Sequence, residues 1–204
     1  MKTIISHSLF DMPVIKTGDP NILENALSFF IRKGVKNTSM QEVALKSGMS
    51  RKKLYNLFIN KERLVIALVE NIIFKSEQFL SVCPGNSPDA AVEMNNIFSY
   101  IKRTIDFLPP LLCREIKRYY PNAWQLVYEF REKKLEPFIL QNFKRGIAEY
   151  LYQSEFNKEV ACWLYFWQLQ IAIEDPSLNK ERRHQLIDNI NNCLLKGILK
   201  SRPF

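Results

Sequence analysis

The sequence predicts an all-α protein of about nine helices. Apolar residues recur at spacings of three and four along most of the chain, which is the period of helices packed on one side. Signals for β-hairpins are scarce, because the chain has only six glycines and no Asn-Gly or Asp-Gly pair. With 47% hydrophobic and 12% aromatic residues among 204, the chain can bury a substantial core and is not disordered.

Helix-start and helix-stop residues mark the first and fourth predicted helices. Asp19-Pro20 places a capping residue before a proline at the first helical position, and Gly34 ends this helix. The fourth helix is expected to begin near Asn60 and to continue to about Leu80, with apolar residues on one face.

Two short helices are predicted between them. The first begins with the capping box Ser39-x-x-Glu42 and ends at Gly48. The second has Ser50 as its cap. Its expected buried residues are Leu54, Leu57 and Phe58.

The segment 39–58 has the spacing of a helix-turn-helix. The small residue Ala44 lies four positions before Gly48, and the apolar Leu54 lies six positions after it. A small residue lets two helices cross closely, a glycine permits the tight turn, and an apolar residue locks the second helix onto the first.

Three consecutive cations, Arg51, Lys52 and Lys53, fall in the first turn of the second of these helices. A helix N-terminus carries roughly half a positive charge, so each cation there costs about 0.3–1 kcal/mol. The preceding helix instead has an acid, Glu42, in its first turn. A bound polyanion would explain the contrast, because its phosphates would accept hydrogen bonds from the free N–H groups and the cations. The alternative is a solvated basic face without a ligand.

The distribution of charge agrees with a polyanion-binding amino-terminal region. Residues 1–75 hold twelve Lys and Arg against six Asp and Glu, so they carry +6 of the net charge of +8. In a DNA major groove, Arg51 and Lys52 or Lys53 could reach guanine, and Asn56 could read adenine. Tyr55 offers a hydroxyl to a phosphate. The candidate DNA contacts are Ser39, Ser50, Arg51, Lys52, Lys53, Tyr55, Asn56 and Lys61.

A longer pattern contains these residues. It runs Ile22-Leu23-x-x-Ala26-x-x-x-Phe30-x-x-x-Gly34, then Thr38-Ser39-x-x-x-Val43-Ala44-x-x-x-Gly48-Met49-Ser50, then Leu54-Tyr55-x-x-Phe58-x-x-Lys61-x-x-Leu64. This pattern resembles the DNA-binding domain of the tetracycline-repressor (TetR) family of bacterial transcription regulators. The resemblance covers about residues 20–70 without a gap, and beyond it extends only to the number and length of the helices.

The resemblance implies a homodimer, usually a repressor, that binds a palindromic operator in double-stranded DNA and leaves it when a small molecule binds the carboxy-terminal domain. By position in the family pattern, Arg51, Lys52 and Lys53 would face bases. Thr38, Tyr55 and Lys61 would hold phosphates. The expected domains are an arm (1–18), a helix-turn-helix DNA-binding domain (19–66, core 39–58) and a helical effector-binding and dimerisation domain (67–204).

The carboxy-terminal part is also predicted to be helical. A break at 83–88 contains two prolines and a glycine. Amphipathic segments follow near 89–107, 110–119, 122–152, 157–174 and 180–199, and Pro137 is expected to kink the long third segment.

The last two segments are candidates for a dimer interface. The segment 157–174 is apolar around most of its circumference, so it must be covered on several sides. It is either the central helix of the core or a helix with one side against a second subunit. The expected interface residues are Trp163, Phe166, Trp167, Ile187, Ile190 and Leu194.

The segment 89–152 is rich in aromatic residues, some of which could line an effector cavity. For any one of them, a place in the ordinary core is the more common outcome. Trp124 and Tyr128 share a face four positions apart, and with Phe98 they are the candidate effector-pocket residues.

Other classes of function find little support. The four cysteines form no CxxC pair and only two histidines are present, so no metal site is expected. The sequence lacks GxSxG, HExxH and a phosphate-cradling glycine loop, so we expect neither an enzyme nor a bound cofactor. The most apolar window, 160–173, is too short to cross about 30 Å of hydrocarbon, and a cytoplasmic protein without membrane contact is expected. The alternative is a basic helical adaptor that binds a protein or an anionic membrane surface without reading a sequence.

Overall fold

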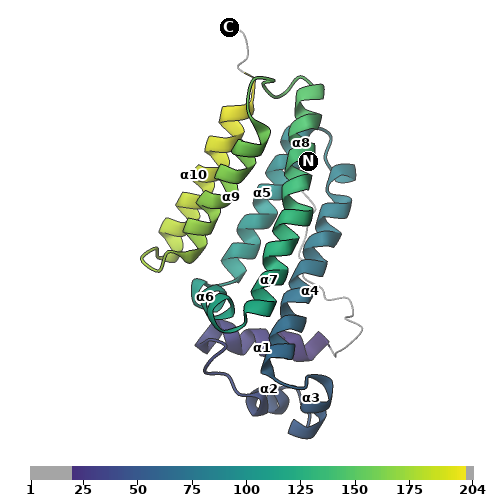
Figure 1. Cartoon of the computed structure of the whole chain (residues 1–204), viewed down its shortest axis with the longest axis vertical. Helices are drawn as coiled ribbons and strands as arrows, with labels where there is room; N and C mark the ends of the chain where they lie inside the picture. The colour runs from purple at the N-terminus through teal and green to yellow at the C-terminus, as the bar shows by residue number, and fades with distance from the viewer. Residues whose placement is uncertain (1–19, 201–204) are drawn as a thin grey trace, which may run out of the picture. The chain divides into compact units, whose positions relative to one another are not determined.

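The computed structural model describes residues 20–200, and the arm expected at residues 1–18 lies outside the described residues. The helices are α1 (Pro20–Lys33), α2 (Met40–Lys46), α3 (Arg51–Leu57), α4 (Lys61–Val82), α5 (Ala90–Phe107), α6 (Pro110–Tyr119), α7 (Pro121–Phe130), α8 (Glu136–Ala148), α9 (Lys158–Glu174) and α10 (Lys180–Ile198), with a short 3-10 helix, η2 (Pro84–Asn86). A π-helical segment, η3 (Arg131–Leu135), joins α7 to α8. If α7, η3 and α8 are counted as one continuous helix, residues 20–200 hold nine α-helices and no strand. This confirms the predicted all-α fold (Figure 1).

The described chain divides into two compact units. The first contains residues 20–76 and 115–127, and the second contains residues 77–114 and 128–200. The first unit therefore holds α1, α2, α3 and most of α4, together with the end of α6 and most of α7. Sequence reasoning did not associate residues 115–127 with the helix-turn-helix.

The core of the first unit follows the helical period. Ile22, Ala26 and Phe30, each four positions apart on α1, are all buried. Leu64 and Leu68 repeat this spacing at the start of α4 and are buried as well. In α3 only Leu54 is buried, and Leu57 is 42% exposed, contrary to the prediction. The helical period does not separate these residues, because positions three and four after Leu54 share its face. The packing of the unit buries Phe58 with Leu54 and leaves Leu57 largely exposed.

The core of the second unit lies among α5, α8, α9 and α10. Its buried side chains include Met94, Ile97, Phe98, Phe143, Tyr152, Tyr165 and Ile187. Helices α9 and α10 lie side by side (Figure 1). Within residues 20–200, no helix combines the length and the apolar character needed to cross a membrane.

A change of helical period occurs where the sequence predicts a kink. The amide N–H of Glu136 donates to the carbonyl of Arg131, five positions earlier, and Pro137 follows immediately. A proline ring clashes with the carbonyl four positions before it, and the wider π turn gives that carbonyl more room. The helix predicted to reach residue 152 ends instead at Ala148, because Tyr150 has a left-handed backbone, with φ at 59°.

Candidate nucleic-acid interface

Helix α2 begins with a complete capping box. The amide N–H of Glu42 donates to Oγ of Ser39 over 3.2 Å, and the amide N–H of Ser39 donates to Oε2 of Glu42 over 2.8 Å. The ammonium of Lys33 also pairs with the Glu42 carboxylate. These contacts, the Lys33 hydrogen bond first, lower the pKa of Glu42 from 4.5 to about 2. At the start of α2, the capping box therefore pairs free N–H groups, and the Glu42 carboxylate complements the helix dipole.

A tight turn joins α2 to α3. Gly48 has φ at +65°, and no atom lies within 4 Å of where a side chain would begin, so the backbone conformation alone requires glycine there. The amide N–H of Met49 donates to the carbonyl of Ala44 over 3.0 Å, and closes the turn. Ala44 and Leu54 are buried on either side, as the helix-turn-helix spacing predicts.

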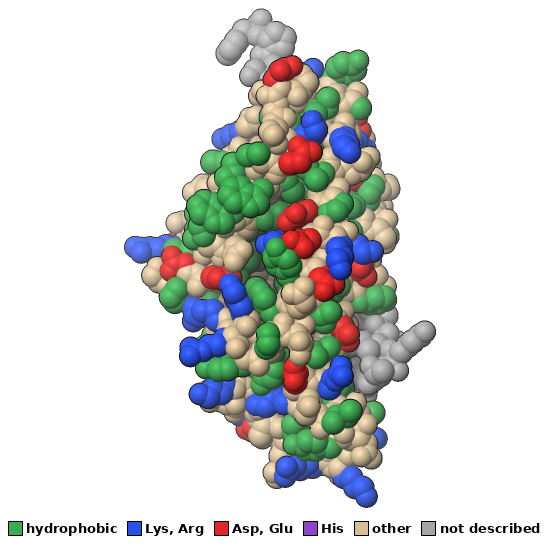
Figure 2. Space-filling view, in the orientation of Figure 1, with side chains coloured by type: hydrophobic (Ala, Val, Ile, Leu, Met, Phe, Trp, Pro, Cys, Tyr) green, Lys and Arg blue, Asp and Glu red, His purple; other side chains and the backbone are tan. Residues whose placement is uncertain are grey.

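Helix α3 begins with a cap but without an acid. Oγ of Ser50 accepts from the amide N–H of Lys53 over 3.2 Å. Arg51, Lys52 and Lys53 are exposed, and none of them forms an ion pair with any residue in the range 20–200. The guanidinium of Arg51 lies 5.3 Å from the centre of the Tyr55 ring. This helix end therefore presents three cations to solvent, and Figure 2 shows Lys and Arg side chains over this region.

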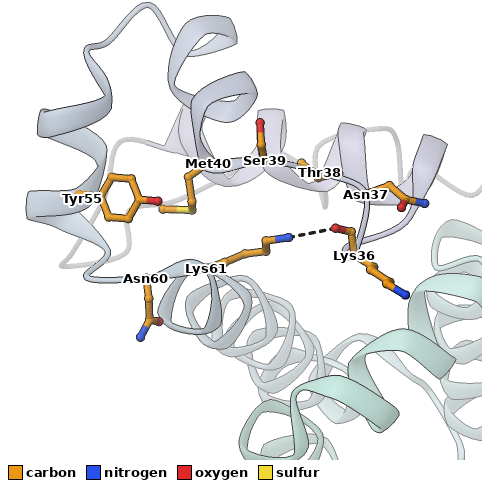
Figure 3. Close-up of a pocket in the computed structure, with 8 residues that line it drawn as sticks. All are labelled: Lys36, Asn37, Thr38, Ser39, Met40, Tyr55, Asn60 and Lys61. Atoms are coloured by element: carbon orange, nitrogen blue, oxygen red, sulfur yellow. Dashed lines mark hydrogen bonds between the residues drawn. The ribbon is translucent and has the colours of Figure 1, made fainter.

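An open groove of about 360 Å³ lies beside α3. Figure 3 shows the loop between α1 and α2 on one wall, Tyr55 on the opposite wall and Lys61 on the floor. The lining residues are Lys36, Asn37, Thr38, Ser39, Met40, Tyr55, Asn60 and Lys61. Four of the nine predicted DNA contacts, Thr38, Ser39, Tyr55 and Lys61, thus border one groove.

Two of these four side chains are already engaged within the protein. Thr38 is 1% exposed, and its hydroxyl donates to the carbonyl of Gly34 over 2.8 Å. Nζ of Lys61 donates to the carbonyls of Val35, over 2.9 Å, and Lys36, over 3.3 Å. Burial lowers the pKa of Lys61, and the nearby Glu115 carboxylate opposes that effect. Both side chains therefore hold the loop in the single chain, and their contacts with phosphates stay a prediction.

Sequence reasoning missed two residues of this region. Oδ1 of Asn60 accepts from the amide N–H of Arg63 over 2.9 Å, so Asn60 caps α4 while it lines the groove. An asparagine just before a predicted helix is the sequence signal for such a cap. Glu115 accepts from the amide N–H of Lys36 over 3.1 Å, and 79 positions separate the two residues. No local pattern could have indicated that contact.

Residues 22–68, which contain α2, α3 and the residues that line the groove, match the family model described as "Bacterial regulatory proteins, tetR family". The helix-turn-helix domain of this chain is therefore a domain of the tetR family. The chain is a DNA-binding transcriptional regulator with a helix-turn-helix domain. No curated protein sequence matches the chain.

Solved structures share the fold of this regulator along nearly its whole length. A transcriptional regulator from Cytophaga hutchinsonii ATCC 33406 has 20% identity and a TM-score of 0.70, over 88% of this chain and 97% of that chain. A TetR-family regulator from Agrobacterium tumefaciens has 19% identity and a TM-score of 0.68, over 88% and 96%. FadR from Bacillus subtilis, in complex with stearoyl-CoA, has 15% identity and a TM-score of 0.64, over 87% and 98%.

The three candidate effector-pocket residues have different surroundings in the regulator. Phe98 is 4% exposed, and its ring lies 5.4 Å from that of Tyr165 in the core of the second unit. Trp124 belongs to the first unit, with Nζ of Lys117 5.7 Å from its ring centre. Tyr128 belongs to the second unit and is 42% exposed beneath the Arg131 guanidinium. Phe98 is therefore a core residue, and the pocket stays a prediction.

The predicted dimer residues also divide into two groups. Phe166, Ile187 and Ile190 are buried in the core of their own chain, and their part in a dimer interface stays a prediction. They are buried because α9 and α10 pack against each other and turn these side chains inward. Trp163 and Trp167 are 62% and 53% exposed, and Leu194 is half-buried.

The exposed side of α9 is apolar along its length. The rings of Trp163 and Trp167 stack in parallel with their centres 6.0 Å apart. Val160, Leu164 and Ile171 are exposed on the same helix. Figure 2 shows apolar side chains gathered over this region. Helix α9 is thus a core helix on one side. Its other side is an apolar face that is uncovered in the single chain.

Proposed function

We propose that the regulator is a sequence-specific repressor that binds a palindromic operator as a homodimer and leaves it when a small-molecule effector binds. The observation that carries the proposal is the group of three exposed cations, Arg51, Lys52 and Lys53, at the Ser50-capped start of α3. The helix dipole disfavours cations there unless an anion occupies the same region. Phosphates and base edges of a duplex supply such acceptors.

The contacts of the side chains support a division of roles among them. Arg51 stacks near the Tyr55 ring, which restricts its guanidinium and favours a bidentate contact to guanine. Lys52 or Lys53 would make a second guanine contact, and the exposed Asn56 would read adenine. Ser39 and Tyr55 border the groove and would face phosphates.

The exposed face of α9 supports a homodimer. A pair of stacked tryptophans is the kind of anchor that dominates protein interfaces, and its aliphatic neighbours would complete an apolar interface core. Two subunits related by a twofold axis present two copies of α3, which fit a palindrome with half-sites one helical turn apart. One seven-residue helix alone contacts too few bases for strong discrimination.

The effector is proposed to bind in the second unit. The structural neighbour FadR contains stearoyl-CoA, and at 15% identity this supports a ligand-binding body in the shared fold without indicating the chemistry of the ligand here. Helix α4 contributes residues to both units, so its displacement would be a direct route to the helix-turn-helix.

Selection of bound duplexes from a random pool tests the proposal. Enrichment of an inverted repeat is expected, because direct base readout by two symmetric α3 helices demands it. Equal recovery of unrelated sequences would contradict it. A parallel titration with anionic vesicles would identify a basic adaptor, which would bind them as well as it binds DNA.

A further inference from the structure

The loop between α1 and α2 is held from two sides by opposite charges. On one side, Oε2 of Glu115 accepts from the amide N–H of Lys36 over 3.1 Å. On the other, Nζ of Lys61 donates to the carbonyls of Val35 and Lys36, over 2.9 and 3.3 Å. One peptide segment, 35–36, is thus fixed between a carboxylate from α6 and an ammonium from α4, all within the first unit.

Gly34 leaves room for this arrangement. Its φ is +84°, and a Cβ there would lie 2.7 Å from Oε2 of Glu115. Such a separation is too short for a side chain, so the carboxylate lies directly against the loop backbone. The buried hydroxyl of Thr38 holds the carbonyl of the same glycine from within the loop.

The loop determines where the DNA-binding elements begin. The loop ends at Ser39, which follows Thr38 and caps α2. Its residues Lys36 to Ser39 form one wall of the groove in Figure 3. A displacement of this loop would move the start of α2 and, through the contacts between α2 and α3, the three cations.

Charge alone does not account for Glu115. An acid in a unit that must approach a polyanion weakens the electrostatic attraction, so a purely electrostatic role would favour its removal. Its contact with the Lys36 N–H supplies a different role, in which the geometry of the loop outweighs the unfavourable charge.

We propose that Glu115 and Lys61 are positioning residues for DNA binding, which clamp the α1–α2 loop and thereby place α2 and α3 against the duplex. This inference rests on the proposed function. Lys61 then acts through the loop, rather than as the phosphate contact that its position in the family pattern implies.

Two variants of equal charge test the role of Glu115. Glu115→Gln and Glu115→Ala both remove one negative charge, and only the glutamine retains an oxygen that can accept from Lys36. Against the duplex returned by selection, Glu115→Gln should bind as tightly as the parent or more tightly, and Glu115→Ala should bind about fivefold to tenfold more weakly, the equivalent of one hydrogen bond. Glu24→Gln, on the exposed side of α1, controls for charge, and thermal melting confirms that each variant is folded. Equal or tighter binding by both Glu115 variants would overturn the clamp.

The salt dependence of DNA binding tests Lys61. If Lys61 binds a phosphate, Lys61→Ala should reduce the slope of log affinity against log salt by about 0.9. If Lys61 instead positions the loop, the variant should bind DNA more weakly while the slope stays unchanged. A reduced slope would return Lys61 to the role of a phosphate-binding residue and remove it from the clamp.

Amide exchange separates the clamp from the proposed function, because it needs no DNA. The Lys36 amide should exchange about tenfold faster in Glu115→Ala than in the parent, and Glu115→Gln should restore most of its protection. Unchanged exchange would refute the clamp whether or not the protein binds DNA. Faster exchange in a protein that binds no duplex would refute the proposed function and leave the clamp intact.

Discussion

Helices α2 and α3 form a matched pair that differs in the charge of its first turn. Each has seven residues, a serine N-cap in extended conformation and a side-chain cap to the third helical residue. That third residue is Glu42 in α2 and Lys53 in α3. The first completes a capping box, and the second adds a cation to the positive end of a dipole.

The difference shows which helix end serves the fold and which serves a ligand. Glu42 is paired with Lys33 and with its own cap, so its charge is fully used inside the protein. Lys53 has no such partner within residues 20–200 and is exposed beside Arg51 and Lys52. A helix start whose charges destabilise the isolated protein indicates that a ligand compensates for those charges.

The largest effect is expected from a variant that cannot form the dimer, because a single α3 helix would then have to bind DNA alone. We expect Trp163→Glu combined with Trp167→Glu to raise the dimer dissociation constant roughly a hundredfold or more, since two exposed aromatic anchors are replaced by charges. Sedimentation equilibrium measures the change. Gln141→Glu adds a charge at an exposed position on α8 instead of on the tryptophan face of α9, and should leave the dimer intact. An unchanged dimer in the double variant would place the interface elsewhere.

Arg51→Ala tests whether the basic helix end reads bases. The variant should lose about 1–3 kcal/mol of discrimination at one base position, because a bidentate guanine contact disappears. Competition with duplexes changed at single positions measures the loss. Lys144→Ala removes an equal charge from an exposed site on α8 and should leave the preference unchanged. A uniform loss across all positions in Arg51→Ala would mean general attraction.

Lys53→Glu gives α3 an acidic third residue, as Glu42 is in α2, and tests directly whether the helix dipole explains the contrast between the two helices. The free energy of unfolding should increase by about 0.3–1 kcal/mol, because an acid now complements the dipole and can complete the capping box. Affinity for the selected duplex should fall at the same time. Chemical denaturation measures the expected gain in stability, and DNA titration measures the expected loss of affinity. Lys144→Glu makes the same change of charge away from a helix start. If Lys53→Glu lowers stability, the dipole does not explain the contrast between the helices.

Acid titration tests the other member of the pair. Because the pKa of Glu42 is lowered from 4.5 to about 2, its stabilising effect is present above pH 4.5 and is lost as the pH falls toward 2. Glu42→Gln should therefore be less stable than the parent at pH 7, and the difference should shrink between pH 4.5 and 2. Denaturation at several pH values measures it, with Glu24→Gln as the control. A difference that is constant over this range would exclude the carboxylate as its cause.

The sequence was sufficient for the helix-turn-helix because its signals are local. The caps at Ser39 and Ser50, the turn at Gly48 and the buried Ala44 and Leu54 all agree with the structure. Each involves residues within a few positions of one another, where backbone hydrogen bonding and helical period restrict the outcome.

Local signals were insufficient where one position could satisfy two roles. Phe166 and Trp167 are neighbours in a helix that is apolar nearly all round, and periodicity cannot state which of them faces the core. The packing of α9 against α10 decided that Phe166 is inside and Trp167 outside. Thr38 is similar, because a hydroxyl suits a phosphate or a backbone carbonyl equally well, and its burial decided for the carbonyl of Gly34.

By itself, the sequence determined the helices, the position of the helix-turn-helix and the cations at the start of α3, because dipoles, caps and spacings act over a single turn. Only the tertiary structure decided that Glu115 and Lys61 hold the α1–α2 loop and that one face of α9 is uncovered. The physical reason is distance along the chain. A contact between residues 79 positions apart depends on how whole helices pack, and no pattern near either residue encodes it.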